Sequence, residues 1–239
     1  ATLVARVAAS QQDNRARLVL AQTADGALVR VADALQAAAA DAAVRVVVFQ
    51  GHETIFSAGN DIGDFLNKPP AGQNSPVFRF LHGIAAFPKP LIAAVCGPAV
   101  GVGTTMLFHC DLVYAGDNAA FSMPFVNLGL CPEAASSLLV PQMLGYHRAA
   151  EALLLGEPFM AEAALEVGLV NRVLPPTEAN GYAQAQARKL AFRWAEVAEH
   201  AKAAGLSYVF WEPMSVGREF GETISAAMSL QTRLTAANM

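Results

Sequence analysis

Short apolar runs rich in Val, Ile and Leu alternate along the chain with segments whose apolar residues recur at helical spacing. A β-branched run that ends at a glycine is typical of a strand buried on both faces of a sheet. The pattern predicts strands at 16–21, 44–51, 90–97 and 110–116, and a shorter strand within 168–175. It predicts helices at 28–42, 134–144, 147–155, 161–167, 177–204 and 215–237, with a turn leading into a helix at 98–109.

Alternation of strands and helices indicates an α/β fold. The segment after residue 176 is predicted to be almost entirely helical, so we expect an α/β core (1–176) followed by a C-terminal helical region (177–239). This region would pack on the core or on a neighbouring subunit. At 239 residues the chain is long enough for one sizeable domain with a well-buried core.

Composition and charge narrow the classes of function. Hydrophobic residues make up 54% of the chain and charged residues 15%, and part of this apolar excess is expected in a subunit interface. Pro and Gly interrupt the richest apolar stretch, "LIAAVCGPAVGVGTTMLF", so no membrane span is predicted. The net charge of −4 and the scattered basic residues argue against a nucleic-acid partner. The N-terminal stretch lacks the basic and apolar regions of a secretion signal.

Cysteine and histidine positions give no sign of a metal site. Cys96, Cys110 and Cys131 lie in apolar contexts without CxxC spacing, and are expected to be buried free thiols in a reducing compartment. His52 and His109 have no partner at catalytic or metal-ligand spacing, so we expect each to be satisfied or exposed. The sequence therefore predicts no metal.

Glycine-rich turns follow two of the predicted strands. "GPAVGVGTT" is not a phosphate-binding loop, since the required Lys is replaced by Thr104, and it does not match the dinucleotide GxGxxG pattern. No GxSxG or HExxH motif occurs in the chain. A second such turn lies in "FSAGNDI". Two turns that each present a free backbone N–H could form an oxyanion hole. The alternative, which spacing alone favours, is that both are ordinary tight turns.

Three segments together resemble the crotonase (enoyl-CoA hydratase/isomerase) superfamily. They are "VRVVVFQGHETIFSAGNDIGDF", "KPLIAAVCGPAVGVGTTMLFHCDLVYAGDNAAFSMPFVNLGLCPEAASSLLVPQMLG" and "RAAEALLLGEPFMAEAALEVGLVNRVLP", and the match runs in order over about two thirds of the chain. The resemblance implies a spiral of ββα turns with a C-terminal helical region, assembled as a homotrimer or a dimer of trimers. It also implies an acyl-CoA thioester substrate, with coenzyme A as part of the substrate and no separate cofactor.

The resemblance assigns positions to the site. The thioester oxygen would accept hydrogen bonds from the backbone N–H groups of Ala58 and Val102. Hydratases of this superfamily use two glutamates, and this chain has Thr105 and Phe125 at those positions. Neither side chain exchanges a proton near neutral pH, so ordinary hydratase activity is not expected. The remaining positions implied to contact substrate are Phe56, Ser57, Gly59, Asn60, Asp61, Ile62 and Gly101, together with Thr105 and Phe125 themselves.

Glu133 is the candidate catalytic residue. It lies in "NLGLCPEAASSLL" among small and apolar residues, with no Lys, Arg or His within ten positions on either side. Sequence alone favours another interpretation, in which Glu133 is a glutamate at a helix start that interacts with first-turn N–H groups. "FSMPFVNLGLCPEAASS" resembles the peroxisomal-type Δ3,Δ2-enoyl-CoA isomerases, whose single catalytic glutamate occupies this position. An apolar environment would raise the pKa of its carboxyl toward neutrality, as a carbon base requires.

Other carboxylates and other reactions remain open at this point. Asp61 is expected to support its loop or contact the substrate rather than act as a base, and Asp111 is expected to be structural. The leading hypothesis is an enoyl-CoA isomerase that uses Glu133 as acid and base. The alternatives are a thioester hydrolase or a similar crotonase reaction, or a non-catalytic acyl-CoA-binding protein. Because the chain ends in "TAANM", without a peroxisomal tripeptide, a cytoplasmic location is expected.

Overall fold

The computed structural model describes residues 2–9, 17–22, 27–60, 63 and 75–203, and side-chain surroundings from residue 30 to residue 192 within those ranges. A six-stranded sheet runs in the order β2-β1-β3-β4-β6-β9. β1 is antiparallel to both of its neighbours, whereas the pairs β3–β4, β4–β6 and β6–β9 are parallel. The strands are β1 (Thr2–Ala9), β2 (Arg17–Gln22), β3 (Val44–Gln50), β4 (Leu91–Val95), β6 (Leu112–Gly116) and β9 (Arg172–Leu174).

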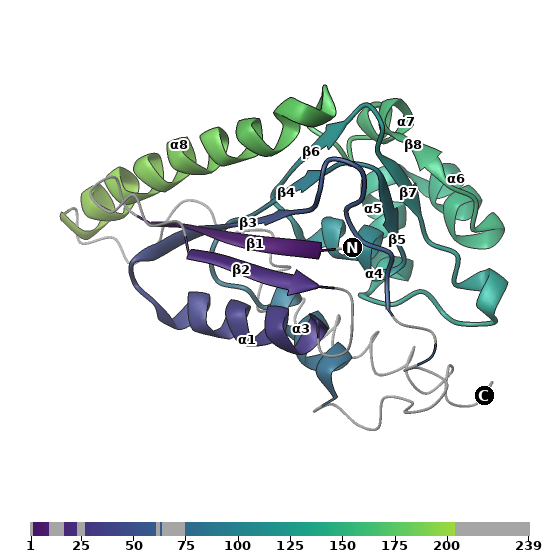
Figure 1. Cartoon of the computed structure of the whole chain (residues 1–239), viewed down its shortest axis with the longest axis horizontal. Coiled ribbons are helices and arrows are strands. Elements are labelled where there is room, and N and C mark those ends of the chain that lie inside the picture. The colour runs from purple at the N-terminus through teal and green to yellow at the C-terminus, as the bar shows by residue number, and fades with distance from the viewer. Residues whose placement is uncertain (1, 10–16, 23–26, 61–62, 64–74, 204–239) are drawn as a thin grey trace.

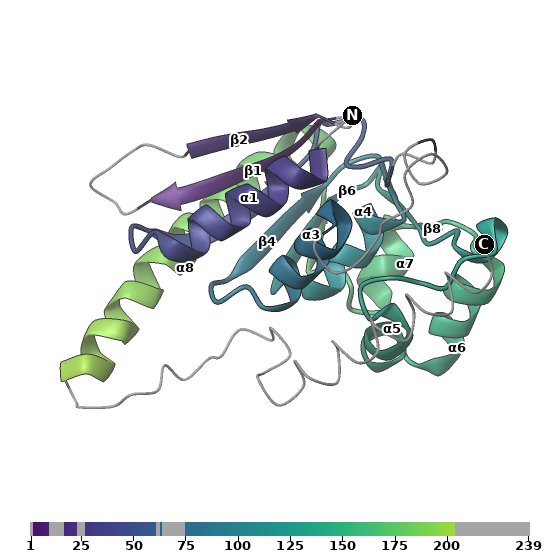
Figure 2. The same cartoon turned by 90° about the horizontal axis from the view of Figure 1, so that it is seen from below.

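Helices cover both faces of this sheet, which explains why its central strands are apolar throughout (Figure 1). Val46 and Val48 face the long helix α8 (Pro176–Ala203), while Val47 and Phe49 lie in the larger core on the opposite side. That side is covered by α1 (Ala27–Ala40) and α3 (Pro76–Ala85), as the view from below shows (Figure 2). Every residue of β3 except one is buried, as expected for a strand between two helical layers.

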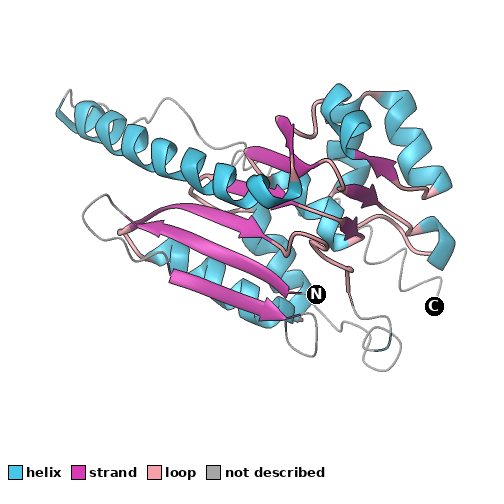
Figure 3. Cartoon of the chain, turned by 45° about the horizontal axis from the view of Figure 1, so that its top comes forward, coloured by secondary structure: helices cyan, strands magenta, loops and turns pink. Residues whose placement is uncertain are grey.

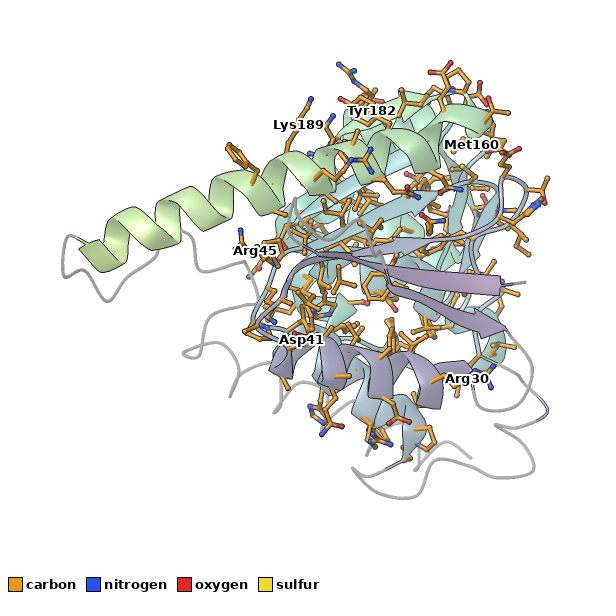
Figure 4. The ribbon with its side chains drawn as sticks, turned by 60° about the vertical axis from the view of Figure 1, so that its left-hand side comes forward. Arg30, Asp41, Arg45, Met160, Tyr182 and Lys189 are labelled. Carbon is orange, nitrogen blue, oxygen red and sulfur yellow. The ribbon has the colours of Figure 1, made fainter. Side chains whose placement is uncertain are left out.

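α8 packs on the sheet through a stripe of small side chains. Ala183, Ala187 and Ala191 recur every four residues and are buried against the apolar residues of β3, β4 and β6. Arg45, at the start of β3, lies beneath this helix and its guanidinium Nη1 donates to the Ala191 carbonyl at 3.3 Å (Figure 4). The part of the predicted C-terminal helical region that the structure describes is therefore packed on the α/β body.

A second, three-stranded sheet lies at one end of the first (Figure 3). It contains β5 (Pro98–Val100), β7 (Ala120–Ser122) and β8 (Phe159–Met160), with β5 parallel to β7 and β7 antiparallel to β8. Short helical segments surround it. They are α4 (Val102–Thr105), the 3₁₀ turns η1 (Met106–His109) and η2 (Val126–Leu128), α5 (Ser136–Leu144), α6 (Tyr146–Ala150), the π-helical turn η3 (Glu151–Leu155) and α7 (Ala161–Glu166).

The strand and helix predictions are largely confirmed, with specific differences. β1 and α3 were not predicted, and the segment 98–109 begins with strand β5 before it turns into α4. The helix predicted at 147–155 is divided between α6 and a π-helical turn. The start of α8 at Pro176 coincides with the expected boundary at 176/177, although the division into two parts remains a prediction. The helix predicted at 215–237 lies outside the described residues.

Candidate active site

The loop that follows β3 is held along the edge of β5 by backbone hydrogen bonds. The N–H groups of Phe56 and Ser57 both donate to the Pro98 carbonyl at 3.1 Å, and the Val100 N–H donates to the Ser57 carbonyl at 2.9 Å. Phe56 is fully buried and anchors the loop in the core. The two glycine-rich turns, about 40 residues apart in sequence, are therefore brought side by side.

Gly59 and Gly101 make this close approach possible. Their φ angles are +88° and +55°, a region that residues with a Cβ rarely adopt. A Cβ at Gly59 would lie 2.9 Å from the Val100 carbonyl oxygen and 4.0 Å from the Cα of Gly101. Ala58 and Val102 are the immediate chain neighbours of these glycines. Within the described part of the chain, neither the Ala58 N–H nor the Val102 N–H donates to a protein acceptor.

The first turn of α4 is fixed in position by its neighbours. Gly103 lies against Ser57, and the N–H groups of Thr104 and Thr105 donate to the Gly101 carbonyl at 2.9 Å. The Thr104 hydroxyl donates to the Ala99 carbonyl at 2.5 Å and accepts the Ser122 N–H at 3.1 Å. One buried hydroxyl therefore joins α4 to both parallel strands of the small sheet. These contacts hold the turn that carries Val102 against the turn that carries Ala58.

Thr105 and Phe125 are both buried, and neither carries a group that titrates near neutral pH. The Thr105 hydroxyl is fully enclosed and has no hydrogen-bond partner among the described residues. Phe125 belongs to the main hydrophobic core and is 8% exposed. The structure therefore places an apolar ring and an unpaired hydroxyl where the resemblance identifies the hydratase glutamates.

Glu133 lies in the loop between η2 and α5 rather than at the start of the helix. α5 begins at Ser136 after Ala135, and no side chain caps its N-terminus. The Glu133 carbonyl accepts the Ser136 N–H at 3.0 Å and the Ser136 hydroxyl at 2.5 Å. Its side chain is free for another role, which weakens the interpretation of Glu133 as a helix-start glutamate.

One oxygen of the Glu133 carboxylate is shielded from water. The residue keeps some exposed surface, but its oxygen Oε1 is buried and has no hydrogen-bond partner among the residues described. Burial raises the pKa of the Glu133 carboxyl from its ordinary value of 4.5 to about 7. A carboxylate with this pKa can both accept and return a proton near neutral pH, which is the property of a general acid–base.

The backbone next to Glu133 is strained. Ala134 and Ala135 have φ angles of 54° and 55°, in the left-handed region that costs a residue with a Cβ about 1–2 kcal/mol. Both side chains are buried, and the Ala134 carbonyl lies 2.9 Å from Nε2 of His109. His109 ends η1, which follows α4 directly, so the segment that carries Val102 contacts the loop that carries Glu133. Sequence reasoning gave no sign of this contact.

The other candidate residues have different outcomes. His52 is exposed and its Nδ1 lies 3.0 Å from the Thr54 hydroxyl, in agreement with expectation. Asp111 is structural, as predicted, because its carboxylate accepts the Leu91 N–H at 2.8 Å where β4 and β6 pair. Asn60 lies beside Gly59 and its buried Oδ1 has no partner in the described chain. Asp61 and Ile62 lie outside the described residues.

Neither a metal site nor a membrane span is found in the described chain. No group of three or more His, Cys, Asp or Glu side chains among the described residues is arranged to hold a metal ion. No helix among them is both long and apolar enough to cross a membrane.

Solved structures share this architecture. The putative enoyl-CoA hydratase/isomerase from Acinetobacter baumannii superposes with a TM-score of 0.76 at 35% identity, over 93% of this chain and 94% of that one. Among characterised relatives, enoyl-CoA delta isomerase 2 from Rattus norvegicus is 43% identical over 148 residues, which are 59% of this chain and 38% of that protein. 2,3-Dehydroadipyl-CoA hydratase from Escherichia coli K12 is 36% identical over 165 residues, or 69% of this chain and 65% of that protein.

A profile of the enoyl-CoA hydratase/isomerase family matches residues 24–208. The fold is thus that of a crotonase, and the chain belongs to the enoyl-CoA hydratase/isomerase family. It spans about two fifths of the length of the delta isomerase relative and about two thirds of the length of the hydratase. Relatives named for different reactions, an isomerase and a hydratase, both match this chain.

Proposed function

We propose that this protein is an enoyl-CoA isomerase that moves the double bond of a 3-enoyl-CoA to the 2-position, with Glu133 as its only acid–base. The observation that carries the proposal is the Glu133 carboxyl, whose oxygen Oε1 is buried without a partner among the described residues and whose pKa is raised to about 7. The similarity to enoyl-CoA delta isomerase 2 supports the same reaction.

The reaction has two proton transfers and needs no other reactant. Glu133 removes a proton from C2 of the 3-enoyl thioester, and the C–H electron pair moves to the thioester oxygen through a dienolate. The N–H groups of Ala58 and Val102 donate to that oxygen, where the negative charge develops. The protonated Glu133 then returns the proton to C4, which leaves the double bond between C2 and C3. The product is an isomer of the substrate, so atoms and charge balance.

Hydratase chemistry fits this site poorly. Addition of water requires one group to deprotonate the water while another protonates carbon, and Thr105 and Phe125 can do neither. In the proposed isomerase, Thr105, Phe125 and the turn residues Phe56, Ser57, Gly59, Asn60 and Gly101 would instead shape the acyl and thioester site. No metal or redox cofactor is needed in this proposal, because backbone N–H groups supply the electrostatic stabilisation.

The proposal is tested with 3-enoyl-CoA, by following the absorbance of the conjugated thioester and the exchange of the C2 proton in D₂O. Glu133→Gln keeps the shape and hydrogen-bonding ability of the side chain but removes the basic oxygen. We expect substrate binding to survive and turnover to fall by about 10²–10⁴-fold or more. Glu162→Gln, at an exposed glutamate in the first turn of α7, is the matched control and should retain activity.

The alternatives give different products in the same assay. A thioester hydrolase would release free thiol, and a binding protein would neither exchange the C2 proton nor move the double bond. A Glu133→Gln variant that isomerises within about threefold of the parent would exclude Glu133 as the base. Thr105→Glu or Phe125→Glu alone should not create a hydratase, since a second carboxylate and a water site would still be missing.

We also propose assembly as a homotrimer or a dimer of trimers. Exposed apolar side chains gather on η2 and η3, which contact each other beside the small sheet. Gly156, which ends η3, is close enough to η2 that a Cβ there would lie 3.1 Å from the Val126 side chain. The exposed residues of this η2/η3 patch are Val126, Leu128, Leu154 and Leu155. A patch of this kind marks a surface for protein association.

A further inference from the structure

We propose that His109 is a positioning residue for Glu133, because its imidazole holds the Ala134 carbonyl and with it the left-handed turn that carries the Glu133 side chain. The inference rests on the proposed function, in which Glu133 is the base. It assigns a role to a buried histidine that the proposed proton transfers do not use.

The contact defines the state of the imidazole. A carbonyl oxygen can only accept a hydrogen bond, so Nε2 of His109 must carry the proton that it donates to Ala134 at 2.9 Å. Nδ1 is then the unprotonated nitrogen, and it is buried without a partner in the described chain. Burial also lowers the pKa of His109, which favours the neutral ring. His109 therefore acts as a fixed hydrogen-bond donor.

The position of the contact explains why it matters for Glu133. The carbonyl groups of Glu133 and of Ala134 are each held by hydrogen bonds from one other residue. Ser136 donates to the Glu133 carbonyl through both its N–H and its hydroxyl, and His109 donates to the Ala134 carbonyl. The Ser136–Glu133 hydrogen bond closes a turn whose two central residues, Ala134 and Ala135, are both left-handed. Alanine does not favour that conformation, so it persists only because surrounding contacts enforce it.

A general base must be held close to its productive geometry, and a displacement of about 1 Å can reduce the rate by about 100-fold. Without the His109 contact, Ala134 and Ala135 would be free to relax toward ordinary backbone angles. That rotation would redirect the chain next to Glu133. The effect should appear in the catalytic rate more than in substrate binding, since in the proposed reaction Glu133 transfers the proton while Ala58 and Val102 hold the thioester oxygen.

The test compares three variants of His109 in the full chain. His109→Gln places an amide N–H near the position of Nε2, His109→Asn carries the same amide on a shorter side chain, and His109→Leu fills the space without a donor. We expect His109→Leu and His109→Asn to lose about 10–100-fold in kcat with KM within about threefold, and His109→Gln to recover most of the loss. His52→Gln, at an exposed histidine, is the control and should match the parent.

A second-site change separates positioning from general stability. In the His109→Leu background, Ala134→Gly and Ala135→Gly allow positive φ without strain, and should recover part of kcat. If His109 only filled the core, these glycines would not recover kcat. Equal kcat values for His109→Leu and His109→Gln, or no recovery by either glycine, would overturn the proposal.

Amide hydrogen exchange provides a readout that does not depend on the reaction. The N–H groups of Ser136, Leu138 and Leu139 donate to the carbonyls of Glu133 and Ala135. We expect all three to exchange faster in His109→Leu than in His109→Gln, and unchanged exchange would contradict the role of His109. If the parent protein does not isomerise 3-enoyl-CoA, the proposed function fails, while this measurement still decides whether His109 holds the turn.

Discussion

Gly103 lies so close to Ser57 that a Cβ at position 103 would be 2.7 Å from the Ser57 Cβ and 3.2 Å from its carbonyl oxygen. The two residues are 46 positions apart in sequence, and each is next to a proposed oxyanion-hole donor, Val102 and Ala58. The separation of the two N–H groups is therefore set by a contact that only glycine allows at position 103.

Gly103→Ala should widen this contact and separate the two donors. We expect kcat/KM to fall by about tenfold or more, and stability to fall by about 1–3 kcal/mol because the site is overpacked. The control is Gly181→Ala on the exposed surface of α8, where a Cβ would meet nothing within 4 Å. That control should be neutral or stabilising, since Ala is the better helix former. If Gly103→Ala retained full activity, the close approach would not set the donor geometry.

The pH dependence of the reaction should follow the Glu133 carboxyl. Burial raises its pKa to about 7, and the base is active only when it is deprotonated. We therefore expect kcat/KM to rise by about tenfold per pH unit well below pH 7 and to level off above it. Initial rates with 3-enoyl-CoA between about pH 5.5 and 9 measure this profile. A rate that stays constant down to pH 5.5 would show that a group with an ordinary carboxyl pKa is the base.

The same pKa shift predicts that Glu133 destabilises the fold at high pH. The folded protein binds the proton more tightly than the unfolded chain, so its stability falls as the pH rises from about 4.5 to about 7. The full difference is on the order of 3 kcal/mol above pH 7. Glu133→Gln removes this penalty and should unfold at a higher temperature than the parent at pH 8, with the difference shrinking toward pH 5. Thermal unfolding of both proteins across this range measures the effect, and an offset independent of pH would contradict it.

The η2/η3 patch should be covered by another copy of the chain. We expect sedimentation at micromolar concentration to give a mass of about three times 25.1 kDa, or about six times if trimers pair. Leu154→Glu, at a side chain that is 70% exposed, should weaken the assembly. Phe192→Glu, at a 44% exposed residue of α8 outside the patch, is the control and should leave the mass unchanged. A monomeric parent protein, or equal effects of both substitutions, would argue against this surface.

The three parallel strands at the centre of the sheet could be predicted from local pattern, because burial on both faces requires nearly continuous apolar residues. β3, β4 and β6 are such runs, and each is found within two residues of its predicted bounds. β1 and α3 were missed, and the contacts of β1 are with strands elsewhere in the chain. The place of β1 in the sheet depends on its pairing with β3, and a local sequence pattern does not predict that pairing.

The sequence by itself determined the family, the two glycine-rich turns and the one carboxylate in an apolar segment. Residue type and spacing were enough to identify these features, because they are local. A glutamate with no basic residue nearby in the sequence, and glycines in turns, can be recognised without the fold. The tertiary structure decided how they meet. Gly103 against Ser57 and His109 against Ala134 join segments 46 and 25 residues apart. The left-handed turn at Ala134 and Ala135 opposes the intrinsic preference of alanine, so only the surrounding packing and hydrogen bonds could specify it.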